Sequence, residues 1–299
     1  MRILNIGSIN IDKSYDVEKF ITAGKTSKAL AYRQSFGGKG LNQSIALCRA
    51  GAEVWHAGAI GEDGEDIARL LQQEGIHSEY LQRVAGPTGH AIIQIDPSGQ
   101  NCILIDGGAN DSIGHHQVDE ALRHFQAGDA LVLQNEIPCL SYAIRQGRAR
   151  GMRVFLNPSP IERESDIEAI SEADFLILNE VEAQILTGES DSARMLDALV
   201  DKYGQTAIVL TLGKDGVLYA DARERASHGC YDVPVVDTTA AGDTFAGYFI
   251  AAVCAGKSVE AALREASIAS NICVSRPGAA AAIPYRREVD AFAQAAERQ

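Results

Sequence analysis

The stretch ALVLQNEIPCLSYAIRQGRARGMRVFLN, residues 130–157, carries the pattern that decides the fold. Ala130–Gln134 and Val154–Asn157 are runs of strand length that are mostly apolar, as in parallel strands covered on both faces. Between them, Leu140–Arg150 has the length and apolar spacing of a helix. A strand, a helix and a second strand in this order predict a βαβ unit.

The same alternation continues along most of the 299 residues. Further strands are predicted at Ile3–Ile6, Glu53–Ala59, Phe175–Leu178 and Ile208–Leu212. Further helices are predicted at Leu41–Arg49, Asp66–Glu74, Val118–Phe125, Ser192–Tyr203, Ala240–Ala255, Ser258–Cys273 and Arg287–Glu297. We therefore expect an α/β fold with a doubly wound, mostly parallel sheet. Because no linker or repeat interrupts the chain, we expect a single domain over residues 1–299.

Two segments depart from this alternation. Residues 11–35 are polar and lack a helical period. Residues 88–107 have the pattern of a hairpin, in which Ala91–Ile95 and Cys102–Asp106 flank the turn residues 96–101. Ligands bind at the strand ends of open α/β sheets, so we expect these two segments to form a small β-sheet lid over that edge. The alternative is a pair of surface excursions without function.

The charge balance restricts the partners. The chain has 27 Lys and Arg against 40 Asp and Glu, a formal net charge of -13. We expect neither nucleic acid nor an anionic membrane as a partner, whereas an anionic small molecule needs only a local positive site. The longest apolar run, Phe245–Ala255, is too short to span a bilayer. Met1–Gly7 shows no leader pattern, so we expect a cytoplasmic protein.

The segment VDTTAAGDTF, residues 236–245, is the clearest candidate for phosphate chemistry. Neither a P-loop nor a G-x-G-x-x-G fingerprint follows the first strand. In this segment a turn of small residues leads into an apolar helix, and the N–H groups of residues 240–243 would point outward at its N-terminus, where anions bind. An Asp such as Asp243 often serves only as a helix cap. The small residues before it and Asp237 are not needed for a cap.

A second candidate is the segment FGGKGLNQ, residues 36–43. Its glycines would let backbone amides approach a ligand closely. Lys39 offers a compact positive charge, and Asn42 offers both a donor and an acceptor. Taken alone, a glycine-rich loop before a helix is more often only a tight turn.

Together these two segments resemble the paired signatures of the ribokinase (PfkB) family of sugar kinases. The resemblance extends over nearly the whole chain and in the same order. It includes the first strand and turn at Gly7–Asp12, the N-P-[AS]-P segment at Asn157–Pro160, the N-x-x-E motif at Asn179–Glu182 and the T-x-G-x-x-G turn at Thr211–Gly216.

The resemblance implies transfer of the γ-phosphoryl group of ATP to a sugar hydroxyl. It places the catalytic base at Asp243 and the anion hole at the amides of Ala240, Ala241 and Gly242. It places nucleotide contacts at Asn179, Thr211, Gly213, Gly216 and Ser267. It places sugar contacts at Asn10, Asp12, Gly38, Lys39, Asn42, Glu136 and Asp243. Mg²⁺ would be positioned by Glu182 and Asn179, partly through water.

Two further properties follow from the resemblance alone. Many family members bind a monovalent cation, usually K⁺, for which the expected ligands here are Asp237, Thr239, Val274 and Ala279. The sequence departs from ribokinases at Ala282, where they usually have serine, and at Pro277, where the residue is usually basic. A homodimer through the lid strands is also expected.

The motif Gly37–Gln43 is most similar to that of ribokinases, so we expect D-ribose as the substrate and ribose 5-phosphate as the product. Fructokinases and ketodeoxygluconate kinases generally replace Lys39, and phosphofructokinase-type relatives tend to lack the segment Asn157–Pro160. A kinase of 2-deoxyribose, or of another pentose or ketose, is the alternative. A catalytically silent sugar-binding regulator would lack the base or the anion hole, and both are present.

Overall fold

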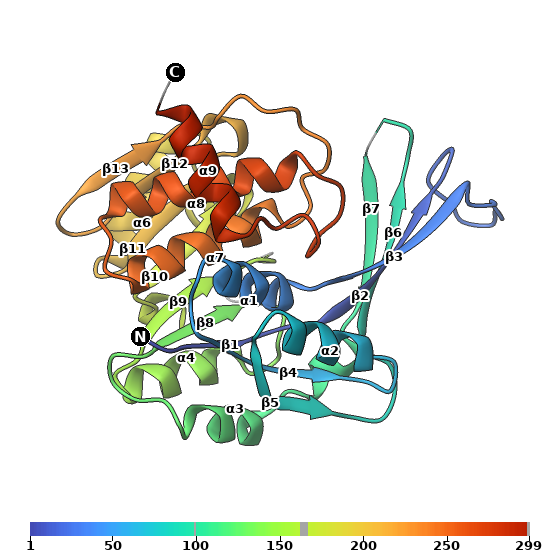
Figure 1. The fold of residues 1–299 in the computed structure, drawn as a ribbon, viewed down its shortest axis with the longest axis horizontal. Helices are drawn as coiled ribbons and strands as arrows, with labels where there is room; N and C mark the ends of the chain where they lie inside the picture. The colour runs from blue at the N-terminus through green and yellow to red at the C-terminus, as the bar shows by residue number, and fades with distance from the viewer. Residues whose placement is uncertain (99, 162–166, 298–299) are drawn as a thin grey trace.

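A large twisted sheet forms the centre of the computed structural model, which describes residues 1–98, 100–161 and 167–297 (Figure 1). The strand order is β13-β12-β11-β10-β9-β8-β1-β4-β5. All neighbours from β11 through β5 are parallel, and β12 and β13 continue the sheet in antiparallel fashion. The strands are β1 (Ile3–Ile6), β4 (Val54–Ile60), β5 (His77–Arg83), β8 (Ala130–Gln134), β9 (Arg153–Asn157), β10 (Phe175–Asn179), β11 (Ala207–Thr211), β12 (Val217–Ala220) and β13 (Arg225–His228).

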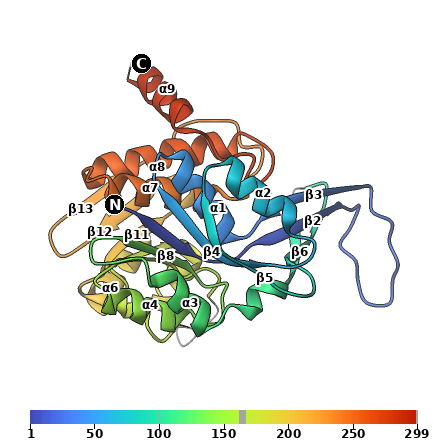
Figure 2. The same cartoon turned by 60° about the horizontal axis from the view of Figure 1, so that its bottom comes forward.

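Helices cover both faces of this sheet, as Figure 2 shows. One face carries α1 (Lys39–Arg49), α2 (Glu65–Gln73), α7 (Ala241–Cys254) and α8 (Val259–Val274), with α9 (Arg286–Ala296) packed on α8. The other carries α3 (His115–Leu122), α4 (Leu140–Ala149), α5 (Glu180–Thr187) and α6 (Ser192–Tyr203). Short 3₁₀ helices lie at η1 (Gly108–Ser112), η3 (Ile170–Glu172) and η4 (Gly213–Asp215). The predicted doubly wound α/β architecture is confirmed.

A second sheet of four strands extends from the body of the molecule (Figure 1). Its order is β3 (Ala31–Gly37), β2 (Asn10–Asp16), β6 (Gly89–Ile95) and β7 (Asn101–Asp106). The predicted hairpin is present as the antiparallel pair β6–β7, although Gly99 of its turn lies outside the described residues. The segments that depart from the βαβ pattern therefore pair with each other instead of joining the main sheet.

The strand order reverses at β1, which pairs with β4 on one side and β8 on the other. Open α/β sheets bind ligands at such a switch point, at the carboxyl ends of the strands. Glycines allow α1 to pack closely here. A Cβ on Gly40 would lie 2.5 Å from the backbone of Gly7, and a Cβ on Gly247 of α7 would lie 2.4 Å from Ala46. The amino-terminal ends of α1 and α7 are thereby held beside the end of β1.

Within the described residues, none of the helices combines the length and apolar character needed to cross a bilayer.

Candidate functional site

A cavity of about 230 Å³ lies where the carboxyl ends of β9, β10 and β11 meet the amino-terminal ends of α1, α5 and α7. Polar groups from segments far apart in the sequence line it. Of the residues singled out in the sequence, this cavity brings together Lys39, Asn179, Glu182, Thr211, Ala240, Gly242 and Asp243.

The buried carboxylate of Asp243 lies in the first turn of α7. Its Oδ2 accepts a hydrogen bond from Asn42 Nδ2 at 3.0 Å, and its Oδ1 accepts one from Gln43 Nε2 at 3.0 Å. Both donors are neutral amides on α1. Asn42 was expected near a sugar, whereas Gln43 is a contact that the sequence did not assign to the site. These two bonds fix the plane of the carboxylate.

The turn before α7 presents backbone N–H groups next to this carboxylate. Ala240 has a left-handed backbone, with φ 59°, and α7 begins only at Ala241. The amide of Ala241 donates to the carbonyl oxygen of Thr238 at 3.2 Å, which corrects the expectation that it points outward. The amides of Ala240, Gly242 and Asp243 donate to no acceptor among the described residues. Three N–H groups thus remain for an anion.

The glycine-rich loop closes against Glu136. Gly38 has φ 90°, and a Cβ there would lie 2.9 Å from the backbone nitrogen of Asn10, so the position requires glycine. The amide of Lys39 donates to Glu136 Oε2 at 3.1 Å, and the hydroxyl of Ser8 donates to the same oxygen. Glu136 therefore orients the loop that carries Lys39 into the cavity lining.

Asn110 on η1 is a supporting residue that the sequence did not reveal. Its Nδ2 donates to Asn10 Oδ1 at 2.9 Å, and its Oδ1 accepts from the amide of Ile9 at 3.0 Å. These bonds hold the Asn10 side chain at the start of β2. An asparagine in a short turn carries no motif that could have singled it out.

Beside Asp243, the pKa values of Asp12, Glu136 and Lys39 are shifted by burial and by neighbouring charges. Burial, together with the carboxylates of Glu136 and Asp243, raises the pKa of Asp12 to about 7. Burial also raises the pKa of Glu136, against the influence of Lys39. Burial alone would lower the pKa of Lys39, but the carboxylates of Asp243, Glu136 and Glu182 raise it above its ordinary value. The site therefore keeps Lys39 charged and leaves Asp12 poised to titrate near neutral pH.

Asn179 and Glu182 form a capping box at the start of α5. Asn179 Oδ1 accepts from the amides of Val181 and Glu182, at 2.9 and 3.1 Å, and Glu182 Oε2 accepts from the amide of Asn179 at 2.9 Å. The N-x-x-E spacing is itself a signature of this cap. Both side chains nevertheless line the cavity. The motif thus has a structural role in addition to the expected one.

The predicted nucleotide residues divide into two groups. Thr211, at the end of β11, lines the cavity. Gly213 and Gly216 flank the η4 turn beyond it, and a Cβ on Gly216 would lie 2.2 Å from the carbonyl oxygen of His228. Ser267 is buried within α8 and, like Gly213 and Gly216, is not part of the cavity lining, so its contact with the nucleotide stays a prediction.

Asp237 joins the two loops expected to bind a monovalent cation. Its Oδ1 accepts from the amide of Thr239 at 2.9 Å, and its Oδ2 accepts from the amide of Gly278 at 2.9 Å. The carbonyl oxygen of Val274 already accepts from the amides of Val236 and Asp237, which leaves it poorly disposed to bind a cation. The carbonyl of Ala279 accepts one bond, from Ala282, and has a second lone pair.

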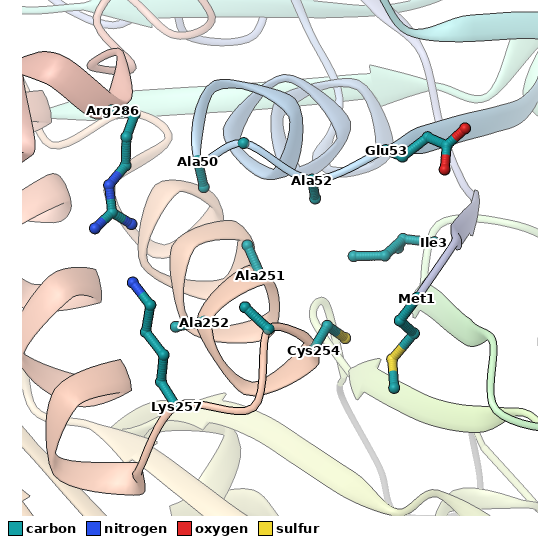
Figure 3. A pocket seen from close by; sticks show the side chains of 12 residues that line it. Met1, Ile3, Ala50, Ala52, Glu53, Ala251, Ala252, Cys254, Lys257 and Arg286 are labelled. Atoms are coloured by element: carbon teal, nitrogen blue, oxygen red, sulfur yellow. The ribbon is translucent and has the colours of Figure 1, made fainter.

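A different cavity, of about 310 Å³, lies at the opposite edge of the sheet, between the start of β1 and the end of α7 (Figure 3). Lys257 and Arg286 point toward one another there. Both are paired with Glu265, at 2.6 and 2.8 Å, and Arg286 is also paired with Asp290 at 2.8 Å, so their two charges are compensated. The functional groups gather at the carboxyl edge instead.

Comparison with known proteins connects this site with a chemistry. The model of the pfkB family carbohydrate kinases matches residues 2–286. The chain belongs to the pfkB family of carbohydrate kinases. The ribokinase of Haemophilus influenzae is 35% identical over 298 residues, which cover 96% of this chain and 96% of that one. The deoxyribokinase of Salmonella typhimurium is 32% identical, covering 95% of this kinase and 96% of the relative.

Solved structures agree with the fold of this carbohydrate kinase. The crystal structure of Thermotoga maritima ribokinase superposes with a TM-score of 0.87 at 32% identity, covering 98% of this chain and 99% of that one. Arabidopsis thaliana ribokinase, solved with ribose and ATP, gives a TM-score of 0.86 at 29% identity, with 97% of each chain covered. The ribokinase-like resemblance predicted from the motifs is confirmed.

The two roles of Asn179 can be separated with a matched helix cap. Asp191 caps α6 in the same way, accepting from the amide of Arg194 at 3.0 Å, but it is not part of the cavity lining. Asn179→Ala and Asp191→Ala should each lower the free energy of unfolding by about 1 kcal/mol in urea titrations. Only Asn179→Ala should raise the KM for Mg-ATP, by about tenfold. Equal KM values in the two variants would restrict Asn179 to capping.

Proposed function

We propose that this kinase transfers the γ-phosphoryl group of ATP to D-ribose, producing ribose 5-phosphate. The observation that carries the proposal is the position of Asp243. Its carboxylate is held by Asn42, which is expected to bind the sugar, and by Gln43, and it lies next to the free amides at the start of α7. The named relatives support ribose as the acceptor, since three of them are ribokinases and one of these three was solved with ribose and ATP.

Asp243 acts as the general base in this proposal. An ordinary carboxylate suffices, because phosphoryl transfer passes through a loose transition state in which the attacking hydroxyl loses its proton late. Asn42 and Gln43 hold the carboxylate in one orientation. A base positioned in this way contributes about 10²–10⁴ in rate.

The three free amides at Ala240, Gly242 and Asp243 stabilise the transferring phosphoryl group. They are fixed before the reaction by the left-handed turn at Ala240 and by the helix that follows. Preorganised N–H groups at a helix N-terminus favour negative charge without reorganising during the reaction. The ammonium group of Lys39 adds positive charge to the same cavity.

In this proposal the sugar lies beside the cavity, against β2, α1 and the segment after β8, whose residues other than Lys39 are not part of the cavity lining. Several carboxylates and amides there suit a molecule with many hydroxyl groups, because each can satisfy one of them. Asn42 Oδ1 is buried without a partner, so it can accept a bond from a sugar hydroxyl. The proposed sugar residues are Asn10, Asp12, Gly38, Lys39, Asn42, Glu136 and Asp243.

Asn179 and Glu182 fit Mg²⁺ through water molecules. Their oxygens are of the hard type that Mg²⁺ prefers, but every one of the four side-chain N and O atoms already makes a bond within the capping box. Within the described ranges, no three residues of the types His, Cys, Asp and Glu gather closely enough to hold a metal. When bound with ATP, Mg²⁺ would neutralise phosphate charge.

We place K⁺ beside the loops joined by Asp237. The proposed ligands are the Asp237 carboxylate and the carbonyl groups of Thr239, Val274 and Ala279, of which the Val274 oxygen already accepts two amide bonds. A cation there would stabilise the turn that presents the α7 amides.

The four-stranded sheet serves as a lid and as a homodimer interface in this proposal. Its edge strand β7 is exposed throughout. Ile103, Leu104 and Ile105 on that strand are each at least half exposed. An apolar surface of this kind on a sheet is typical of an interface.

A kinase of 2-deoxyribose is the second candidate. The 32% identity to a deoxyribokinase nearly equals that to the ribokinases. The two sugars differ by one hydroxyl, which a small change in the pocket can accommodate.

A coupled ADP-release assay with Mg-ATP and K⁺ tests the function directly. Across ribose, 2-deoxyribose, fructose, tagatose, fructose 1-phosphate and adenosine, ribose should give the highest kcat/KM. Replacing K⁺ by tetramethylammonium should lower the rate, because the larger ion cannot enter the site at Asp237. A preference for deoxyribose would select the second candidate. No turnover of any sugar would instead support a sugar-binding regulator.

The raised pKa of Asp12 predicts a pH-dependent KM for ribose. Below about pH 7 the carboxyl group is protonated, and above it the carboxylate accepts a stronger bond from a sugar hydroxyl. The KM for ribose should therefore fall as the pH rises from about 6 to about 8, and Asp12→Asn should remove this dependence. An unchanged pH profile in Asp12→Asn would assign the titration to another group.

A further inference from the structure

Five polar side chains form a continuous network inside the core behind Asp243. They are Asn5 on β1, Gln43 and Ser44 on α1, His56 on β4 and Gln134 on β8, and all are fully buried. Polar groups are costly to bury unless they are hydrogen-bonded to one another. The network begins at Asp243 and ends at His56, so it connects the proposed base to the centre of the sheet.

Gln134 lies at the branch point of this network. One of its amide hydrogens goes to Gln43 Oε1, at 2.8 Å, and the other goes to Asn5 Oδ1, at 3.0 Å. Asn5 Nδ2 in turn donates to Ser44 Oγ and to the carbonyl oxygen of Gly40, both at 2.8 Å. Each amide thus has a single orientation that satisfies its neighbours.

The direction of the hydrogen bond from Gln134 determines which end of the Gln43 amide faces the base. With Gln134 donating to its oxygen, Gln43 must present Nε2 to Asp243 Oδ1, as it does at 3.0 Å. If the Gln43 amide were reversed, its oxygen would face the carboxylate and its nitrogen would face the Gln134 donor. Both contacts would be repulsive.

Gly7 leaves space for the Gln134 side chain, whose own oxygen lacks a partner. A Cβ on Gly7 would lie 2.1 Å from Gln134 Oε1, so only glycine at that position admits the glutamine. Gln134 Oε1 itself is buried without a partner. An unpartnered buried acceptor is destabilising, yet both donors of the same amide are used. The two bonds that Gln134 Nε2 donates therefore determine the orientation of this side chain.

We propose that Gln134 is a positioning residue for phosphoryl transfer, acting through Gln43 on the carboxylate of Asp243. Gln134 does not contact Asp243 and is not part of the cavity lining. The inference rests on the proposed role of Asp243 as the base. A carboxylate released from Gln43 would rotate away from the attacking hydroxyl, and small misplacements of this kind are costly in rate.

Two variants of Gln134 test this role. Gln134→Met keeps the length of the side chain and removes both donors, and Gln134→Glu keeps its shape and leaves at most one donor, on a protonated carboxyl group. Each should lower kcat by about 10–100-fold while the KM values for ribose and Mg-ATP change by less than about threefold. Combining Gln134→Met with Gln43→Met should lower kcat no further than Gln43→Met alone, because both act through the same bond.

Ser44→Ala is the matched control. It removes a buried polar group from the same network, but Asn5 keeps its bond to Gly40. Thermal unfolding should show a loss of stability in Ser44→Ala and Gln134→Met alike, with kcat falling only in the latter. Wild-type kcat in both Gln134 variants, or equal losses in Ser44→Ala, would overturn the proposal. Asp243→Asn serves as the reference, since a fully active Asp243→Asn would refute the proposed base instead.

Discussion

Two hydrogen bonds, from the amides of Asn42 and Gln43 to the carboxylate of Asp243, join the two halves of the site. The donors lie on α1, which follows the glycine-rich loop. The acceptor, Asp243, lies in the first turn of α7, 200 residues after Gln43. These bonds require α1 and α7 to be in close contact, which Gly247 permits. The sugar residues, the free amides and the proposed base can act on one substrate only while this contact holds.

The sheet supplies the frame for that contact. Because the strand order reverses at β1, the loops after β1 and β8 diverge and leave room for ligand. Gln134, the last residue of β8, and Glu136, two residues beyond it, point to different partners. Gln134 points into the core toward Gln43, while Glu136 accepts bonds from Ser8 and Lys39. Because β8 ends at Gln134 and a turn follows, one short segment supports both the base and the sugar loop.

Much of the fold could be predicted from the sequence, because long apolar runs alternate with helical periods and buried parallel strands have a strong signal. Edge strands such as β5 and β13 were not predicted, since their residues are largely exposed and polar. At the site, Asp243, Lys39 and Asn42 were indicated by motifs. Asn110, Gln134 and the bond from Ala241 to Thr238 could not be, since each depends on side-chain or backbone direction in three dimensions.

The account depends most directly on Asp243 as a base whose loss slows the chemical step far more than it weakens sugar binding. Single-turnover kinetics of Asp243→Asn, with ribose affinity measured separately by calorimetry, tests this claim. We predict a ribose Kd within a few-fold of the wild-type value and a chemical step slowed by about 10²–10⁴. A chemical step at the wild-type rate with ribose bound would contradict the account.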